Sequence, residues 1–315
     1  MNPLVSVVIV THDRSRLLEN CLKGVQGQTY PHIEVIVVDN GSHDETYSIL
    51  ATVFNRVIVI KSQENELYAR AANKGMRQAR GEIIVCLNND VSLDREFITE
   101  AVSAFFLDPR IGMVQGKILA ADGRRIDSTG LFLSRSGSAR ERGHRRPDTT
   151  LYEAPGFVFG VCGAVGCYRR SMLVDIEEDG SCFDEAYEFF YEDLDLCIRA
   201  QTRGWKAYYT PRAVAFHKRG GTCQAAPPLG RGEGRRRYAF MGLPNHLKIM
   251  YLSNRYYMLR KHCTRWHIVQ NLPWLLMLEL RWWLYLLFFE PHLIGPVITR
   301  VRLLITGLKE KGCKT

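Results

Sequence analysis

The chain has 315 residues, of which 46% are hydrophobic, so it can bury the core of one large α/β domain with an appended segment. Its formal net charge of +9 predicts an anionic partner, with nucleic acid, anionic lipid and phosphorylated substrates all compatible. The nine cysteines are odd in number and form no CxxC pair, so neither a disulfide framework nor a zinc site is indicated.

The N-terminal half alternates short apolar segments with helical patterns. Its first segment follows Met1 to Leu4 directly, with no basic n-region, so we expect no secretory signal. The scattered cysteines favour a reducing, cytosolic location. β-branched apolar runs of this kind are typical of strands buried on both faces, and their alternation with helices predicts a parallel sheet. The expected strands are residues 5–10, 33–38, 57–60 and 83–87, and the expected helices are residues 17–25, a segment led by Asp44 and Glu45, and residues 67–80.

The strand at 83–87 ends on three polar residues, Asn88, Asn89 and Asp90. Open α/β sheets bind ligands at the carboxyl ends of their strands. One carboxylate and two amide oxygens suit Mg²⁺ or Mn²⁺, which share their remaining positions with water and substrate phosphates. The alternative is a simple Asn/Asp turn after a strand.

Two other strand ends carry polar side chains. Thr11 ends the first strand and Asp39 ends the second, where a carboxylate can accept hydrogen bonds from a base or ribose. A helix-capping role is the alternative for Asp39. The glycines do not spell GxGxxG, so Gly41 is interpreted as a turn residue.

Beyond the central strand the pattern becomes less regular. We expect a helix at 97–106 and a strand at 113–119, and then hairpins and a mobile surface loop at 124–148, whose arginines are either solvated or directed at an acceptor. The small residues 160–164 are expected to lead into a helix towards residue 173. They allow either close approach of a ligand to the backbone or tight packing.

A second polar stretch, Glu192, Asp193 and Asp195, follows the aromatic residues 189–191. Helical residues two apart diverge by about 200°, so Asp193 and Asp195 cannot share one face. One carboxylate can point into a cleft while its neighbours cap the helix or bind Arg199. Partial desolvation by the aromatic residues would raise the pKa of that carboxylate, which suits a general base, and plain capping is the alternative.

Short strands are then expected at 205–209 and 214–216, with His217 directly after the second. This histidine is either a hydrogen-bonded surface residue or a further ligand of an oxygen-rich metal site. Residues 218–238 are rich in Gly, Pro and Arg, which predicts a flexible lid or linker.

From Asn245 onward the composition of the chain changes. Basic and aromatic residues are interleaved from 255 to 266, and residues 272–289 are apolar over about the ~20 residues that a spanning helix needs. Glu279 and Arg281 stand near the centre of that stretch, and burying each in a bilayer costs roughly 2.5 to 3.5 kcal/mol. We therefore expect a helix that lies in the interface beside anionic headgroups; a helical cap on the core or a dimer interface is the alternative.

Together, residues 5–217 resemble the family 2 glycosyltransferases of the inverting, nucleotide-binding type, and among them the bacterial rhamnosyltransferase-like branch. Each motif is weak alone, but their order and spacing are specific. The motifs are Val5-Ser6-Val7-Val8-Ile9-Val10-Thr11, Val37-Val38-Asp39-Asn40-Gly41-Ser42, Asn73-Lys74-Gly75, Leu87-Asn88-Asn89-Asp90, Tyr191-Glu192-Asp193-Leu194-Asp195-Leu196 and His217.

The resemblance implies a GT-A fold, a Rossmann-like nucleotide-sugar-binding domain with a mostly parallel sheet, at residues 1–219. A flexible loop at 220–244 and a helical, membrane-associated extension at 245–315 would follow. The implied ligands are a nucleotide-diphosphate sugar donor, Mg²⁺ or Mn²⁺, and a glycan or lipid-linked acceptor.

The resemblance also implies a role for each matched residue. The donor is expected at Thr11, Asp39, Arg70, Asn88 and Asn89, and the metal at Asp90, Asn88 and His217. Asp193 matches the catalytic base, and Glu192, Asp195 and Gly163 are expected to support the base or the acceptor. Asn88 replaces the first Asp of the DxD motif, which implies that the metal is held more weakly or mainly by Asp90 and the diphosphate.

We therefore predict an inverting, metal-dependent transferase of a hexose, or of a deoxyhexose such as rhamnose, in cell-surface polysaccharide synthesis. The enzyme would be cytoplasmic and peripheral on the inner face of the membrane, and a homo-oligomer is compatible with the sequence. Its basic residues are dispersed and form no nucleic-acid module, so no nucleic-acid partner is expected. The alternative hypothesis is an inactive sugar-nucleotide sensor or scaffold.

Overall fold

The computed structural model describes residues 2–52, 54, 56–219 and 239–310. The chain divides into two compact units, each described here by itself. Unit 1 comprises residues 1–132, 141–188 and 192–224, and unit 2 comprises residues 133–140, 189–191 and 225–315. Most of the segment expected to be a flexible loop, residues 220–238 of 220–244, lies outside the described residues.

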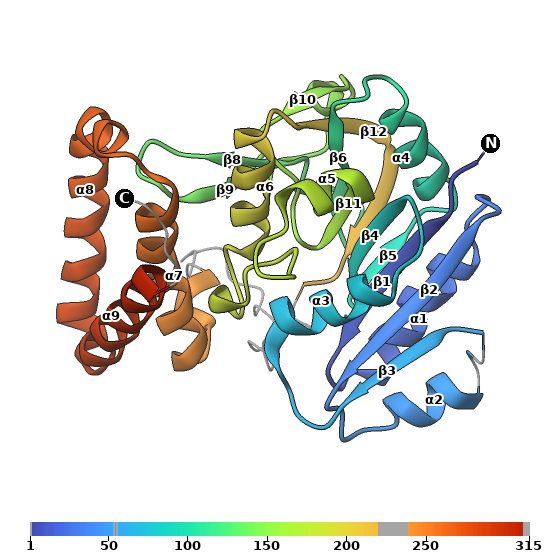
Figure 1. The fold of residues 1–315 in the computed structure, drawn as a ribbon, viewed down its shortest axis with the longest axis horizontal. Coiled ribbons are helices and arrows are strands. Elements are labelled where there is room, and N and C mark those ends of the chain that lie inside the picture. The colour runs from blue at the N-terminus through green and yellow to red at the C-terminus, as the bar shows by residue number, and fades with distance from the viewer. Residues whose placement is uncertain (1, 53, 55, 220–238, 311–315) are drawn as a thin grey trace. The chain divides into compact units, whose positions relative to one another are not determined.

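Unit 1 is built on a ten-stranded sheet (Figure 1). Its strands are β1 (Val5–Thr11), β2 (Ile33–Asn40), β3 (Ile58–Ser62), β4 (Ile83–Asn88), β5 (Val91–Leu93), β6 (Ile111–Ala120), β7 (Ile126–Ser128), β10 (Gly156–Val158), β11 (Val165–Arg169) and β12 (Lys206–His217). The main path runs β10-β12-β6-β11-β4-β1-β2-β3, with β5 paired to β12 and β7 to β6. Strands β8 (Leu131–Leu133) and β9 (Ala139–Glu141) form a separate pair.

Helices α1 to α6 belong to unit 1 and helices α7 to α9 to unit 2. Their bounds are α1 (Ser15–Gln26), α2 (Thr46–Thr52), α3 (Leu67–Gln78), α4 (Phe97–Phe105), α5 (Arg170–Ile176), α6 (Glu192–Thr202), α7 (Asn245–His262), α8 (Arg265–Phe289) and α9 (Ile294–Glu310). Short 3-10 helices span Thr150–Tyr152, Glu185–Tyr187, Ala239–Gly242 and Pro291–Leu293.

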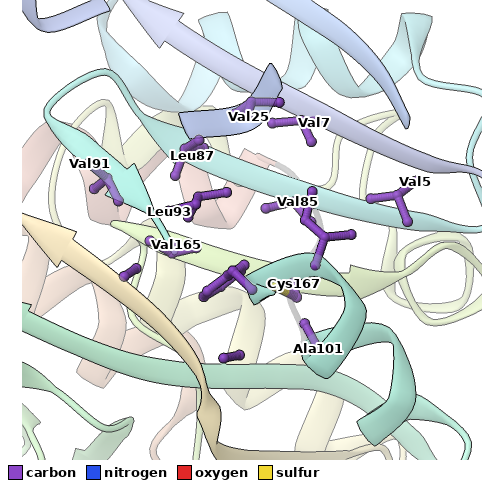
Figure 2. Close-up of a cluster of buried hydrophobic side chains, with 14 of the residues drawn as sticks. Val5, Val7, Val25, Val85, Leu87, Val91, Leu93, Ala101, Val165 and Cys167 are labelled. Atoms are coloured by element: carbon purple, nitrogen blue, oxygen red, sulfur yellow. The ribbon is translucent and has the colours of Figure 1, made fainter. Parts of the chain in front are cut away.

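Strand β4 shows why the central strands read as continuous apolar runs. Val85 and Leu87 point into a cluster that includes side chains of α1 and α4, as Figure 2 shows, whereas Ile84 and Cys86 point into a second cluster with α3, α5 and α6. Successive side chains of a strand point to opposite faces, so a sheet with helices on both faces must be apolar at every position. The predicted two-sided burial is confirmed.

The first four strands are parallel, as the sequence predicts. β1 pairs in parallel with both β2 and β4, and β2 pairs in parallel with β3. In the rest of the sheet β12 also runs parallel to β6, whereas β11 runs antiparallel to β4 and β6, and β7 runs antiparallel to β6. The sheet is therefore mixed, with antiparallel strands that the sequence did not predict. Parallel neighbours need long crossover connections, whereas only residues 121–125 separate β6 from β7.

Two local assignments also differ from the structure. The small residues 160–164 lead into β11 before the helix α5, because Val165 and Cys167 are buried in the core opposite β4. The two short strands expected at 205–209 and 214–216 are one strand, β12, whose register with β6 shifts between Thr210 and Val214. Such an irregularity interrupts the apolar pattern, so one strand gives the sequence pattern of two.

In unit 2, helices α7, α8 and α9 surround a small core (Figure 1). Its buried members are Phe240, Leu252, Leu286, Leu293 and Val297. Of the helices in the described chain, α8 is long and apolar enough to cross a membrane by length and composition, and 11% of its most apolar 18-residue window is buried.

The negative charge at the centre of α8, Glu279, has its partners within unit 2. The Glu279 carboxylate pairs with Arg255 of α7, accepts a hydrogen bond from the Tyr256 hydroxyl and lies 3.2 Å from the Trp283 indole nitrogen. Arg255 also donates to the Ser136 carbonyl at 2.6 Å. Glu279 therefore has a cationic partner, while large apolar side chains on the same helix are exposed: Trp266, Val269, Leu276, Met277, Leu280, Leu287, Phe288 and Phe289.

Candidate active site

The polar strand ends predicted from the sequence meet at one edge of the sheet in unit 1. Thr11 lies opposite Asp39 in the β1–β2 register, and Val10 lies opposite Asn88 in the β1–β4 register. This alignment follows from parallel pairing, because the carboxyl ends of β1, β2 and β4 all finish at the same level. Residues that are far apart in the sequence thereby line a single edge.

Asp39 is buried at this edge with one oxygen unused. Its Oδ1 accepts a hydrogen bond from the Ser42 backbone N–H at 3.0 Å, whereas its buried Oδ2 has no hydrogen-bond partner among the described residues. A buried acceptor without a partner is costly, so such an atom is well suited to an N–H or O–H donor of a ligand.

Thr11 and Asn89 connect this position to the turn after β4. The Asn89 side-chain amide donates to Thr11 Oγ1 at 2.9 Å, and the Thr11 hydroxyl donates to the Asp13 carbonyl at 3.2 Å. The amide of Asn89 thus fixes the turn that carries Asp90. Asn88, the last residue of β4, is half-buried, and its backbone N–H donates to the Ala164 carbonyl at 3.0 Å.

Asp90 and His217 are brought together by the pairing of β5 with β12, in which His217 lies opposite Val91. Nε2 of His217 is 3.2 Å from Oδ1 of Asp90, and Nδ1 is 2.8 Å from Oδ2 of Asp127. Burial by itself lowers the pKa of His217, but its hydrogen bonds to Asp127 and Asp90 outweigh burial and raise the pKa to about 9.

Sequence reasoning missed Asp127 and its neighbours. Asp127 lies in β7 and also binds Arg219, whose guanidinium reaches Glu141 as well. Although burial opposes it, hydrogen bonding from His217 and the charge of Arg219 lower the pKa of Asp127. Asp127 and Glu141 come from the segment 124–148, whose lack of periodicity gave no signal of a site, and Arg219 lies in the stretch 218–238 that was expected to be a lid or linker.

The donor set fits a hard divalent cation that takes part of its coordination from a substrate. Asp90 offers a carboxylate oxygen and His217 an imidazole nitrogen, with Asn88 at the end of the adjoining strand. Among the residues that the structure describes, no three His, Cys, Asp or Glu side chains are grouped to hold a metal ion. A cation here would complete its shell with water and phosphate oxygens, as Mg²⁺ and Mn²⁺ commonly do.

Asp193, at the start of α6, is held by two backbone N–H groups. Gly163 N donates to Oδ2 at 2.9 Å and Leu194 N donates to Oδ1 at 2.7 Å. Burial raises the pKa of Asp193 to about 6, although these two hydrogen bonds act in the opposite direction. A carboxylate with such a pKa is ionised at neutral pH and still a better proton acceptor than an exposed one.

The two flanking carboxylates differ from Asp193. Glu192 is buried, its Oε2 has no hydrogen-bond partner in the described part of the chain, and burial together with the charge of Asp193 raises its pKa to about 8. Asp195 faces away and binds Arg199, with 2.8 Å between Oδ2 and Nε. The divergence of Asp193 and Asp195 is the one expected from helix geometry.

Arg70, expected near the donor, lies on α3 and is exposed. Its Nε is 3.1 Å from Oε2 of Glu185, so the structure places it in a surface ion pair. Contact with a donor would require this pair to open. The structure thus groups most of the predicted residues into a strand-end set and an α6 set, and it engages Arg70 elsewhere.

Comparison with known proteins supports the architecture. Residues 6–173 match the family model of glycosyl transferase family 2. The chain is 28% identical over 225 residues to the O-antigen biosynthesis protein RfbC of Myxococcus xanthus, covering 68% of this chain and 17% of that protein. It is 24% identical over 217 residues to poly-beta-1,6-N-acetyl-D-glucosamine synthase of Staphylococcus aureus, covering 67% of this chain and 49% of that protein. The chain thus spans about half or less of the length of these curated relatives.

Two solved structures have a similar fold. One is S. aureus TarS 1-349 in complex with UDP-GlcNAc, with a TM-score of 0.59 and 15% identity over 95% of this chain and 81% of that one. The other is the mannosyltransferase PcManGT from Pyrobaculum calidifontis in complex with GDP-Man and Mn²⁺, with a TM-score of 0.51 and 18% identity over 97% of this chain and 76% of that one. The fold is of the GT-A type with a mixed α/β sheet, and the chain belongs to glycosyl transferase family 2.

Proposed function

We propose that this protein is an inverting glycosyltransferase that transfers a sugar from a nucleotide-diphosphate donor during polysaccharide synthesis. The observation that carries the proposal is the half-buried Asp193 carboxylate, fixed by the N–H groups of Gly163 and Leu194, with a pKa raised to about 6. A sensor or scaffold would have no use for a carboxylate prepared in this way. Family membership and relatives named for O-antigen and N-acetylglucosamine polymer synthesis support the same reaction class.

The donor would bind at the strand ends. The unused oxygen of Asp39 would accept a hydrogen bond from the base or ribose, and Thr11 and Asn89 would shape the same edge. Asp90, His217 and Asn88 would hold Mg²⁺ or Mn²⁺ against the diphosphate, and PcManGT, which was solved with Mn²⁺, supports a divalent cation. When bound, the cation supplies positive charge where the leaving phosphate oxygens become more negative. Arg70 would contact the donor once its ion pair with Glu185 opens.

Asp193 would act as the general base. It would remove the proton of an acceptor hydroxyl as that oxygen attacks the anomeric carbon on the face opposite the diphosphate. This single displacement inverts the anomeric configuration and needs no covalent sugar intermediate. Because Glu192 has the higher pKa of the two, it would hold a proton at neutral pH and leave the negative charge on Asp193. Asp195 would support the helix through Arg199.

The transferred sugar is proposed to be a hexose or a deoxyhexose such as rhamnose, and the acceptor a glycan or lipid-linked glycan. The first measurement is a thermal-shift panel of nucleotide sugars with Mn²⁺ or Mg²⁺, because a ligand that binds only the folded state raises the melting temperature. The donor so found is then incubated with acceptor and the product configuration is read by NMR. Inversion, with Asp193→Asn binding donor but not transferring, supports the proposal; retention of configuration or full activity of Asp193→Asn contradicts it.

We also propose that α8 lies on the inner face of the cell membrane, which would make the protein peripheral. The support is the exposed apolar side of α8 together with an apolar groove of about 980 Å³ in unit 2 that includes Arg140 and Arg281 among its lining residues. Aromatic and basic side chains together are typical of helices that lie in a bilayer interface.

Sedimentation with phosphatidylcholine vesicles containing phosphatidylglycerol tests this location. The wild type should sediment, whereas the triple variant Trp266→Glu, Leu280→Glu, Phe288→Glu should stay in solution. Phe106→Glu in unit 1 is the matched control, since Phe106 is equally exposed but lies away from α8 in the chain. A wild type that ignores these vesicles and self-associates through α8 would favour the homo-oligomer instead.

A further inference from the structure

Asp127 is a buried carboxylate that neither the family motifs nor the proposed mechanism has so far used. Its side chain is 3% exposed, and it lies in β7, which is paired to the end of β6. One oxygen, Oδ2, is 2.8 Å from Nδ1 of His217, and the other binds Nε of Arg219. Both oxygens therefore face nitrogen donors.

This arrangement determines which nitrogen of His217 is available to a ligand. A carboxylate accepts hydrogen bonds and cannot donate them, and both ring nitrogens of His217 face one: Nδ1 faces Asp127 at 2.8 Å and Nε2 faces Asp90 at 3.2 Å. When a cation beside Asp90 takes the lone pair of Nε2, the remaining ring proton lies on Nδ1, where Asp127 accepts it. Histidines that bind metals usually donate their other ring N–H to a carboxylate or carbonyl, which fixes the orientation of the ring.

We propose that Asp127 is a positioning residue that holds His217 with Nε2 directed at the divalent cation, together with Asp90. The inference rests on the proposed function, because it assumes the metal site at Asp90 and His217. Arg219 has a supporting part: it binds the second oxygen of Asp127 and links it to Glu141, which keeps the Asp127 carboxylate from rotating away from His217.

The substitution Asp127→Asn should reverse the tautomer while preserving the shape of the side chain. Arg219 is always a donor, so the amide oxygen would face Arg219 and the NH₂ group would face Nδ1 of His217. His217 would then carry its proton on Nε2, where a cation needs the lone pair. The same change of histidine tautomer follows when the aspartate of a serine protease triad is replaced by asparagine.

Mn²⁺ affinity is measured with the metal alone, by the electron paramagnetic resonance signal of free Mn²⁺. Asp127→Asn should bind Mn²⁺ roughly 10-fold to 100-fold more weakly than the wild type, the usual effect of losing a residue that orients a metal ligand. Asp148→Asn is the matched control, because Asp148 is a partly buried carboxylate of the same segment that pairs with Lys117 at 3.2 Å. It should keep the wild-type affinity.

A double-mutant cycle with His217→Ala separates positioning from a general effect of charge. If Asp127 acts through His217, Asp127→Asn should cause no further loss of Mn²⁺ affinity in the His217→Ala background. A full additional loss there would overturn the proposal. Wild-type affinity in Asp127→Asn, with clear losses in Asp90→Ala and His217→Ala, would overturn this inference and leave the proposed metal site intact. Wild-type affinity in all three variants would refute the metal site itself, and this inference with it.

The tautomer can also be read in the wild type, so the proposal remains testable if Asp127→Asn does not fold. With ¹⁵N-labelled histidine and diamagnetic Mg²⁺, His217 should show a protonated Nδ1 and an unprotonated Nε2 in the NMR spectrum. A proton found on Nε2 under these conditions would contradict the positioning role of Asp127.

Discussion

The backbone N–H of Gly163 donates a 2.9 Å hydrogen bond to Oδ2 of Asp193, and it can do so because residue 163 has no side chain. A Cβ at this position would lie 3.2 Å from that same oxygen and 3.3 Å from Cβ of Asp193, closer than ordinary van der Waals contact. The loop before β11 and the start of α6 are thus packed closely together through these two residues.

Gly163→Ala should therefore lower kcat without unfolding the protein. The added methyl group must push Asp193 aside by a few tenths of an ångström, and we expect roughly a 10-fold to 100-fold loss, because small displacements of reacting groups are costly. Steady-state kinetics with the identified donor would measure the loss. Gly156→Ala is the control, since a Cβ there meets no atom within 4 Å, and it should keep wild-type activity.

The pH dependence of kcat/KM should show an acid limb near pH 6. Asp193 accepts a proton only when it is ionised, and its pKa is raised to about 6, so the rate should fall about tenfold per pH unit below that value. Glu192→Gln should leave this limb in place, because glutamine resembles the protonated Glu192 of the neutral enzyme. An acid limb that vanishes in Glu192→Gln would move the base assignment to Glu192.

Glu192 should also make folding stability depend on pH. Burial raises its pKa from an ordinary value of 4.5 to about 8, so the folded state holds a proton that the unfolded chain releases. The resulting stabilisation is complete below about pH 4.5 and is lost as the pH rises towards 8. Melting temperatures between pH 5 and 8 should fall more steeply for the wild type than for Glu192→Gln. Parallel curves would show that Glu192 is not held protonated.

Transfer should require a divalent cation. Activity should disappear in EDTA and return with Mn²⁺ or Mg²⁺, and Asp90→Ala should remove most turnover while its circular dichroism spectrum remains that of the wild type. Asp122→Ala is the control, because this exposed carboxylate lies in the turn after β6 and accepts a hydrogen bond from Arg124 N. Full activity in EDTA, or in folded Asp90→Ala, would refute the metal requirement.

Glu279→Leu should destabilise unit 2 although it makes α8 more apolar. Arg255 is only 4% exposed at its side chain, and removing its partner leaves a buried cation, a change that costs on the order of 3 kcal/mol. Denaturant unfolding would measure the cost. Leu280→Ala, an exposed position on the same helix, should have little effect. A Glu279→Leu protein as stable as the wild type would show that the Arg255 pair contributes nothing net.

The sequence predicts those strands and helices whose pattern lies within one continuous segment. A β-branched apolar run predicts each of the strands β1, β2 and β4. Thr11 and Asp39 lie at the ends of β1 and β2, and Asp90 lies two residues after β4, so their common edge could be predicted from parallel pairing alone. The different directions of the Asp193 and Asp195 side chains likewise follow from the geometry of one helix.

Other features depend on contacts between distant segments. Asp127 is 90 residues from His217, and its segment carries no periodic pattern, so only the pairing of β7 with β6 and of β12 with β6 reveals their contact. Glu279 appeared in the sequence as a charge at the centre of an apolar helix, and its neutralisation by Arg255 depends on the packing of α7. β11 was overlooked because its antiparallel neighbours break the alternation that the first four strands establish.

Strand β1 lies between β2 and β4, so its register determines both the packing of the core and the alignment of the strand ends. A slip of one residue in this strand would turn Val5, Val7 and Ile9 from one core to the other and, in the same movement, separate Thr11 from Asp39. The edge at which we propose that the donor binds is therefore held in register by the hydrophobic layers on both sides of the strand. Nucleotide binding and cooperative unfolding should accordingly report on a single transition, with no state in which the core is intact and this edge is out of register.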